Sequence, residues 1–172
     1  MSARGRSIQL LMAEDDADDR LLAIEALTES RLVNKLKTVV DGEELMDYLH
    51  RRNNYANPEE SPRPDLILLD LNMPRKDGRR AIEEIKTDPK LRGIPIVVLT
   101  TSRAEEDICR SYDLGVSSYI TKPVTFDGLV QVMQTLGCYW FDIVELPQTL
   151  PRTVASSAAA PRIPQPAGTS GR

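Results

Sequence analysis

Four charged side chains stand directly after short apolar runs, at positions where they could do chemistry together. They are Glu14, Asp15, Asp70 and Lys122. Carboxylates that are crowded together repel one another and stay ionised only with a cation among them. Oxygen ligands in a site with few protein donors suit Mg²⁺, which keeps several waters and pairs with phosphate. The residue types therefore predict a magnesium site that can receive a phosphoryl group.

A hydroxyl group adds to this set. Thr100, followed by Thr101, ends another apolar run, so the metal, the Lys122 ammonium and the Thr100 hydroxyl could together hold a phosphoryl group. A carboxylate can attack such a group as a nucleophile, while the cation and Lys122 neutralise charge on its oxygens. No glycine-rich cradle follows the first apolar run, which argues against nucleotide binding of the P-loop or Rossmann kind.

Short apolar runs alternate five times with segments of helical spacing. Strands are predicted at residues 7–13, 35–40, 66–70, 95–100 and 117–121, each followed by a helix. Nearly continuous apolar strands in this alternation predict an α/β fold, with a doubly wound parallel sheet covered by helices on both faces. In such sheets ligands bind beyond the carboxyl ends of the strands, which is where the charged residues stand.

Capping residues mark the starts of three of the predicted helices. Asp41 with Glu44, and Ser102 with Glu105, have the spacing of capping boxes, and Thr125 precedes the last helix. The fourth helix is expected to close at the glycine that follows its last apolar position.

The composition is that of an ordinary globular chain. Its 172 residues carry a net charge of −4, so no basic surplus is available to bind nucleic acid. No apolar run is long enough to cross a bilayer, and the first residues do not form a secretory signal. Cys109 and Cys138 match no metal spacing and are expected to be reduced thiols of a cytoplasmic protein. The single histidine, His50, is expected at an exposed helix end, which leaves the phosphodonor to another protein.

The chain changes character near its C-terminus. Residues 147–172 are rich in Pro, Ala, Ser and Thr and are expected to form a disordered tail, because they cannot bury enough apolar area to offset the entropy of ordering. The apolar stretch before this tail leaves two interpretations open: an extension of the last helix packed on its own core, or a homodimer contact. The stretch comprises Trp140, Phe141, Ile143, Val144 and Leu146.

Four strings at predicted strand ends resemble the signature blocks of response-regulator receiver domains, the CheY-like family. They are LMAED (11–15), LLDLNMP (68–74), VLTTS (98–102) and YITKP (119–123), in that order within residues 7–138. The resemblance implies a flavodoxin-like fold with five parallel strands in the order 2-1-3-4-5. It also implies that residues 1–146 form the receiver domain.

The resemblance implies roles for the acidic residues. Asp70 would be the phosphoacceptor. The Mg²⁺ ligands would be Asp15, Asp70 and the backbone carbonyl of Asn72, with Glu14 acting through a bound water. Glu14 stands where the family more often has Asp, which keeps the charge and adds one methylene.

The resemblance also implies the phosphate contacts and a conformational switch. Lys122, Thr100 and Thr101 would bind the phosphoryl oxygens. Thr100 and Tyr119 would be the switch pair, in which the hydroxyl moves toward the phosphoryl group and the aromatic ring turns inward. Pro123 would have a structural role, following Lys122 through a cis peptide bond.

A closer resemblance concerns the partner. The segments 72–79, 100–102 and 139–147 are similar to single-domain regulators of bacterial and cyanobacterial phytochromes. This implies a sensor histidine kinase of the bacteriophytochrome type as phosphodonor, and it favours a homodimer. No output domain is expected after the receiver, so the output would be protein docking or transfer to a downstream phosphotransfer protein.

Two other functions remain open at this point. Phosphohydrolases with an aspartate nucleophile also place Asp at a strand end with Mg²⁺ and a lysine, but they need a second Asp two residues later, where this chain has Asn72. A docking module that ignores phosphate would share the fold without needing the acidic cluster or Lys122. We expect a binding switch rather than an enzyme that turns over substrate.

Overall fold

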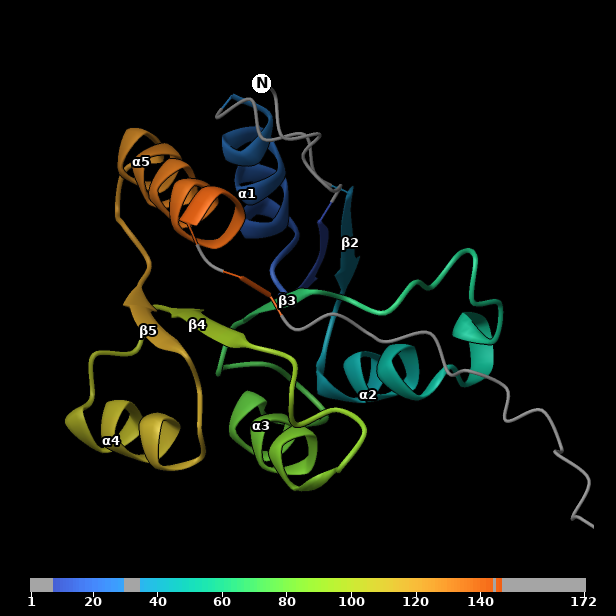
Figure 1. The fold of residues 1–172 in the computed structure, drawn as a ribbon. Coiled ribbons are helices and arrows are strands. Elements are labelled where there is room, and N and C mark those ends of the chain that lie inside the picture. The colour runs from blue at the N-terminus through green and yellow to red at the C-terminus, as the bar shows by residue number, and fades with distance from the viewer. Residues whose placement is uncertain (1–7, 30–34, 144, 147–172) are drawn as a thin grey trace, which may run out of the picture.

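Five strands form one parallel sheet in the computed structural model, which describes residues 8–29, 35–143 and 145–146. The strands are β1 (Gln9–Ala13), β2 (Lys35–Val39), β3 (Leu66–Leu69), β4 (Ile96–Thr100) and β5 (Ser118–Thr121). Their order is β2-β1-β3-β4-β5 (Figure 1), which confirms the predicted fold and strand order. The strands are one or two residues shorter than predicted, mostly at their first residues.

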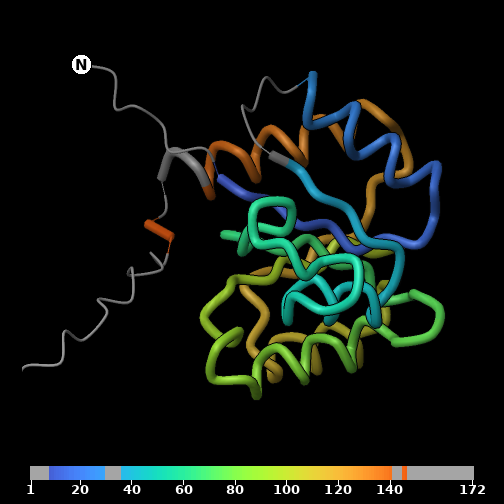
Figure 2. Tube along the Cα trace, turned by 90° about the vertical axis from the view of Figure 1, so that its right-hand side faces the viewer, coloured from blue at the N-terminus to red at the C-terminus, as the bar shows by residue number. Residues whose placement is uncertain are grey.

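Two helices cover one face of the sheet and three cover the other (Figures 1 and 2). On one face lie α1 (Ala17–Glu29) and α5 (Phe126–Gly137). On the other face lie α2 (Gly42–His50), α3 (Gly78–Thr87) and α4 (Glu105–Asp113). A short 3₁₀ helix, η1 (Asn53–Tyr55), follows α2, and a π-helical segment, η2 (Cys138–Ile143), continues α5.

Each face of the sheet has its own buried core. Strand residues alternate between the two: in β1, Leu11 and Ala13 pack in the core shared with α2 and α3, whereas Leu10 and Met12 pack in the core shared with α1 and α5. Every residue of β3 and β4 is buried. Burial from both faces explains why these strands appear in the sequence as continuous apolar runs rather than alternating ones.

Two of the predicted helix caps are confirmed. The Asp41 carboxylate accepts hydrogen bonds from two backbone N–H groups in the first turn of α2, each at 2.9 Å. The Thr125 hydroxyl accepts from the backbone N–H of Gly128 at 3.1 Å and so caps α5. At the end of α2, His50 is exposed, as predicted.

The predicted capping box of α4 is wrong. Helix α4 begins at Glu105, and the residue at its N-cap position, Ala104, has no side chain that can cap. The Ser102 hydroxyl donates instead to the carboxylate of Asp107 at 2.6 Å, because that charged acceptor lies within its reach. The end of α4 agrees with the prediction, since Gly115 follows it with a φ of 95°.

The chain continues as a helix beyond α5. Trp140 is buried in the core under α1 and α5, and Leu146 packs against the same core. The helix-extension interpretation therefore holds for Trp140, whereas Leu146 packs on the same core from beyond the end of the helix. The side chains of Phe141 and Ile143, and the whole of Val144, lie outside the described residues, as does the predicted tail. The homodimer stays a prediction.

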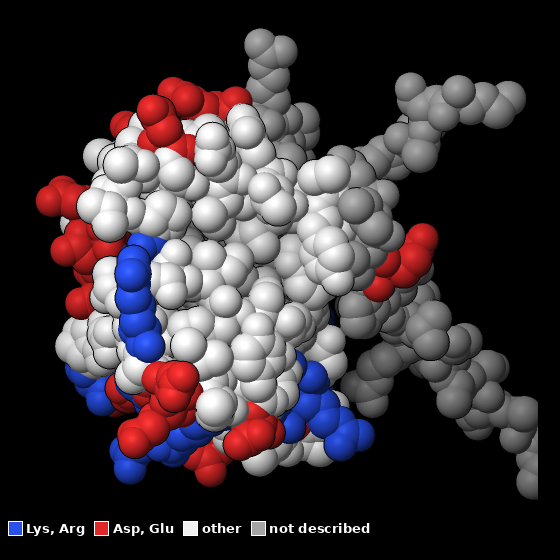
Figure 3. Space-filling view, turned by 90° about the vertical axis from the view of Figure 1, so that its left-hand side faces the viewer, with Lys and Arg blue, Asp and Glu red and all other residues white. Residues whose placement is uncertain are grey.

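The surface over β5, between α4 and α5, is largely uncharged (Figure 3). Acidic and basic side chains gather along the edges of this surface. In the part of the chain that the structure describes, no helix combines the length and the apolar character needed to cross a membrane.

The loop between β3 and α3 folds back so that the backbone of Gly78 lies close against the backbone of Asp70 and Leu71. The backbone N–H of Gly78 donates to the Leu71 carbonyl at 2.9 Å. A Cβ at Gly78 would lie 2.4 Å from the carbonyl oxygen of Asp70 and 2.7 Å from the Leu71 Cα, closer than real Cβ atoms approach. Glycine at this position therefore allows α3 to start directly beside the carboxyl end of β3.

We expect Gly78→Ala to lower the free energy of unfolding by about 1–3 kcal/mol, because the backbone must shift to admit the methyl group. Gly93→Ala is the control, since no atom lies within 4 Å of a Cβ added there. The control should stay within about 0.5 kcal/mol of the wild type. Urea unfolding followed by circular dichroism measures both, and equal losses in the two variants would contradict the steric explanation.

Candidate metal and phosphoryl site

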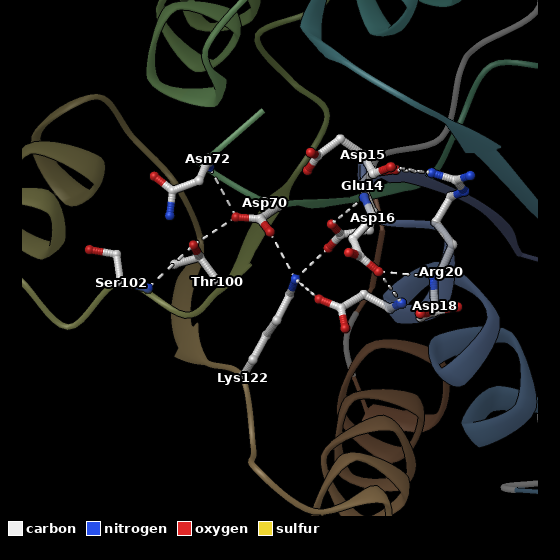
Figure 4. Close-up of polar contacts among 11 residues, drawn as sticks. Glu14, Asp15, Asp16, Asp18, Arg20, Asp70, Asn72, Thr100, Ser102 and Lys122 are labelled. Atoms are coloured by element: carbon white, nitrogen blue, oxygen red, sulfur yellow. Dashed lines mark hydrogen bonds and ion pairs between the residues drawn. The ribbon is translucent and has the colours of Figure 1, made fainter. Parts of the chain in front are cut away.

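Backbone hydrogen bonds between neighbouring strands bring the predicted residues to one edge of the sheet (Figure 4). The N–H of Asp70 donates to the Ala13 carbonyl at 3.0 Å, which sets Asp70 beside Glu14. The N–H of Lys122 donates to the Thr100 carbonyl at 2.7 Å, which joins the ends of β4 and β5 in the same way. Since parallel strands end at the same edge, residues far apart in the chain become neighbours there.

Glu14, Asp15 and Asp70 form a cluster of carboxylates at this edge. One oxygen from each lies within 4.8 Å of the other two. Glu14 and Asp70 are 2% and 6% exposed, whereas Asp15 faces the solvent. The candidate metal ligands in this cluster are all oxygen atoms, and their spacing suits one small hard cation. The solvent-exposed side at Asp15 leaves room for water ligands. The residues therefore fit a divalent metal ion.

The Asp70 carboxylate accepts hydrogen bonds on both of its oxygens. Oδ1 accepts from the Thr100 hydroxyl at 2.7 Å and from the Asn72 backbone N–H at 3.0 Å. Oδ2 accepts from the Lys122 ammonium at 2.8 Å. Burial alone would raise the pKa of Asp70, but these hydrogen bonds favour the charged form and bring the pKa below its ordinary value. Asp70 is thus an ionised carboxylate, the form that can act as a nucleophile.

The Lys122 ammonium lies among three carboxylates (Figure 4). Its Nζ is 2.5 Å from Glu14 Oε2, 2.7 Å from Asp19 Oδ2 and 2.8 Å from Asp70 Oδ2. Burial lowers the pKa of a lysine, but these three acceptors outweigh it, so the pKa of Lys122 lies above its ordinary value. The side chain therefore remains a cation at neutral pH.

Glu14 is buried at this edge beside the Asp70 carboxylate. Burial is the largest cause that raises the pKa of Glu14, and the charge of Asp70 adds to it. The hydrogen bond from Lys122 opposes both, yet the pKa still rises to about 7. A divalent cation bound beside these carboxylates would favour their charged forms.

The peptide bond between Lys122 and Pro123 is trans, as are all peptide bonds among the described residues. The expectation of a cis bond is therefore wrong. The trans form is the ordinary state of such bonds, favoured by ~0.5–1 kcal/mol, and the Lys122 ammonium reaches its carboxylates from it. Pro123 lines a cavity of about 120 Å³ between α1 and the start of α5. Its structural role stays a prediction.

The two predicted switch residues differ in their contact with Asp70: Thr100 touches it, and Tyr119 contacts the loop that follows Thr100. Thr100 is fully buried and contacts Asp70 directly. The Tyr119 ring packs against the core on the α2 and α3 side of the sheet, and its hydroxyl donates to the Ser102 carbonyl at 3.1 Å. Thr101 is exposed, and among the described residues no hydrogen bond involves its side chain. The structure does not bring Thr101 to Asp70, so its phosphate contact stays a prediction.

Sequence reasoning missed two arginines that hold the loops around the site. The Arg20 guanidinium donates to the backbone carbonyls of Glu14 and Asp15 at 2.7 and 2.8 Å, which ties the end of β1 to α1. The Nε of Arg75 donates to the buried carboxylate of Asp41 at 2.7 Å, which ties the loop after β3 to the start of α2. The sequence carries no local signal for either contact, because an arginine in a first helical turn or in a loop is typical of solvated surface.

A bidentate ion pair between α3 and α4 was also missed. Arg79 donates through Nε and Nη2 to the two carboxylate oxygens of Asp107, at 2.7 and 2.6 Å. Asp107 also accepts from the Ser102 hydroxyl, so the loop after β4 joins the same network. The hydrogen bonds from Arg79 and Ser102 lower the pKa of Asp107 to about 2.

Comparison with known protein families agrees with this geometry. Residues 10–134 match the response regulator receiver domain family, and the matched segment contains every residue of the site described above. The chain belongs to this family. The five-stranded parallel sheet described above agrees with this family assignment.

Three comparisons place this receiver near other response regulators, one of which is a phytochrome response regulator. Response regulator Rcp1 of Synechocystis sp. is 43% identical over 138 residues, which cover 80% of this chain and 92% of Rcp1. The structure of the phosphorylated cyanobacterial phytochrome response regulator RcpA is 45% identical with a TM-score of 0.77, covering 83% of this chain and all of RcpA. The Mn²⁺-bound form of Rcp1 is 42% identical with a TM-score of 0.75, covering 82% and 99% of the two chains.

We expect Arg79→Met to raise the pKa of Asp107 from about 2 toward its ordinary value of 3.8, as measured by carbon-13 NMR of the carboxyl group. A lowered pKa in the folded state means that the stabilising contribution is present above pH 3.8 and is lost as the pH falls toward 2. This loss should become smaller in the variant, where the Ser102 hydrogen bond still lowers the pKa of Asp107. Arg80→Met is the control, since Arg80 is exposed. The same titration of Asp107 in both variants would show that Arg79 is not the cause.

Proposed function

We propose that this receiver accepts a phosphoryl group on Asp70 from a sensor histidine kinase, with Mg²⁺ as cofactor, and signals through a change in protein docking. The observation that carries the proposal is the environment of Asp70. It is an ionised carboxylate in contact with the Lys122 ammonium and within 4.8 Å of oxygens from Glu14 and Asp15. A nucleophile, a cation site and a fixed positive charge are the set that phosphoryl transfer requires.

The cation would be held by the carboxylates of Asp15 and Asp70 and by the backbone carbonyl of Asn72, with Glu14 acting through a bound water. Mg²⁺ is proposed because hard oxygen donors suit it better than they suit soft metals. The Mn²⁺-bound form of the relative Rcp1 supports the binding of a divalent metal ion by this receiver. When bound, the ion neutralises charge on the oxygens of the transferred group.

In the transfer step, a carboxylate oxygen of Asp70 attacks the phosphorus atom of a phosphohistidine on the kinase. The new O–P bond forms as the P–N bond breaks, and the electron pair of the broken bond returns to the imidazole nitrogen. Lys122 and the Thr100 hydroxyl bind oxygens of the arriving group. The product carries roughly −1.5 to −2 charges where Asp70 carried one.

The added charge would be sensed through Thr100 and Tyr119, and docking would change at the largely uncharged surface over α4, β5 and α5 (Figure 3). A complete switch from 1:99 to 99:1 requires about 5.5 kcal/mol of preference between the two states. The phytochrome regulators among the relatives support a bacteriophytochrome as the kinase. The homodimer, the downstream phosphotransfer protein and the cytoplasmic location remain predictions from the sequence.

The two alternative functions are less well supported. A phosphohydrolase would need an acid–base carboxyl group two residues after Asp70, and the residue there is Asn72. Steady release of phosphate from small phosphomonoesters would revive that alternative. A docking module that ignores phosphate has no use for three carboxylates whose crowding costs free energy.

We expect Asp70→Asn to abolish phosphoryl labelling of the receiver, because the amide is not a nucleophile toward phosphorus. The wild type should be labelled by a bacteriophytochrome kinase with ATP and Mg²⁺, as detected by intact mass, and EDTA should prevent the labelling. Asp113→Asn is the control, because it removes the same charge from the exposed end of α4. Labelling that persists in Asp70→Asn would refute the assignment of the phosphoacceptor.

We expect Asp15→Asn to weaken Mg²⁺ binding by about 10- to 100-fold, because it replaces a charged ligand oxygen. Asp18→Asn removes the same charge from an exposed position three residues further along and should change the affinity less than about twofold. Isothermal titration calorimetry with MgCl₂ measures both. An unchanged affinity in Asp15→Asn would exclude Asp15 from the ligands.

A further inference from the structure

The hydrogen-bonding capacity of Lys122 is fully used in this structure. An ammonium group has three N–H donors, and Glu14, Asp19 and Asp70 each accept one of them. A phosphoryl oxygen can therefore bind Lys122 only if one of the three carboxylates is released. Which one leaves decides how strongly the site holds a phosphoryl group.

Asp19 reaches Lys122 from a well-ordered helical turn. The Asp16 carboxylate caps α1 by accepting from the backbone N–H groups of Asp18 and Asp19, both at 2.9 Å. Arg20, the next residue, binds the two backbone carbonyls at the end of β1. The Asp16 N–H also donates to Glu14 Oε1 at 3.1 Å, so the first turn of α1 is attached to the site before and after Asp19, and the fold sets its contact with Lys122.

Of the three acceptors, Asp19 is the one that leaves most easily. The side chains of Glu14 and Asp70 are 2% and 7% exposed, whereas that of Asp19 is 40% exposed. Among the described residues, the Asp19 carboxylate has no hydrogen-bond donor other than Lys122. Its release restores hydration to a carboxylate already half in solvent, while release of either buried carboxylate would leave a charge without its ion pair away from water.

We propose that Asp19 is a positioning residue that occupies one N–H of Lys122 in the unphosphorylated protein and competes with the phosphoryl group for it. The inference rests on the proposed function, because it concerns the group that binds Lys122 at the same site. Competition would act in two ways: the Lys122–Asp19 contact must break, and the released carboxylate still repels the phosphoryl oxygens nearby. Asp19 therefore sets how tightly a phosphoryl group is retained.

The test measures binding of beryllofluoride, a phosphoryl mimic, to the full chain in saturating Mg²⁺ by fluorine-19 NMR. Asp19→Asn should lower the Kd by about three- to tenfold, the range expected for a half-exposed ion pair with a charged hydrogen bond. Asp19→Ala should lower it similarly, which provides a second variant if the first folds poorly. Asp19→Glu, which keeps the charge, should return the Kd to near the wild-type value.

Asp18→Asn is the matched control. It removes the same charge from the same turn of α1, but Asp18 is exposed and does not contact Lys122. Its Kd for beryllofluoride should stay within about twofold of the wild type, because exposed charges are screened. The Mg²⁺ affinity, measured without beryllofluoride, should be no higher in Asp19→Asn than in Asp18→Asn, so that tighter metal binding does not explain the result.

The outcomes separate this inference from the proposed function. If the wild type does not bind beryllofluoride in Mg²⁺, the proposed function fails. If the wild type binds it but Asp19→Asn and Asp19→Ala match Asp18→Asn, or bind more weakly, the competitive role of Asp19 alone is overturned. A higher Mg²⁺ affinity that accounts for the whole gain would overturn it as well.

Discussion

Repulsion among carboxylates at the carboxyl ends of β1 and β3 is the constraint on which the rest of this structure depends. The cluster of Glu14, Asp15 and Asp70 is confined to a few ångströms and faces a single ammonium group, that of Lys122. Burial, with a smaller contribution from the Asp70 charge, raises the pKa of Glu14 to about 7, while hydrogen bonds keep Asp70 ionised. An edge of this kind binds an added cation and responds strongly to added negative charge, which are the two properties that a phosphoryl switch needs.

A rigid frame is required to hold like charges at such short distances. The strands supply most of it, since β3 and β4 are buried on both faces and cannot move without opening a core. The connecting loops are held by individual contacts. Gly78 lets α3 begin against the backbone of β3, Arg20 binds the carbonyls that follow β1, and Arg75 binds the buried Asp41 carboxylate. Each contact stops a loop from relieving the repulsion by moving away.

Because these elements are rigid, a change at Asp70 can be transmitted through side-chain contacts to a distant surface of the protein. Thr100 contacts Asp70, and two residues later Ser102 contacts both the Tyr119 hydroxyl and the Asp107 carboxylate. The ion pair of Asp107 then links this loop to α3. A shift of the Thr100 side chain and the loop after it toward an added phosphoryl group would therefore strain contacts on both α4 and β5, the elements beneath the largely uncharged surface of Figure 3.

Much of this could be predicted from the sequence, because the information is local. Apolar runs specify buried parallel strands, and side-chain types at the strand ends, together with the family resemblance, indicate the acidic edge, Asp70 and Lys122. Two local predictions failed: the Ser102 hydroxyl binds Asp107 instead of capping α4, and the bond before Pro123 is trans. The contacts that the sequence did not indicate join separate elements: Asp19 binds Lys122, and Arg79 binds Asp107. Only the assembled sheet decides such contacts, because their free energy comes from partners on other elements that spacing along the chain does not identify.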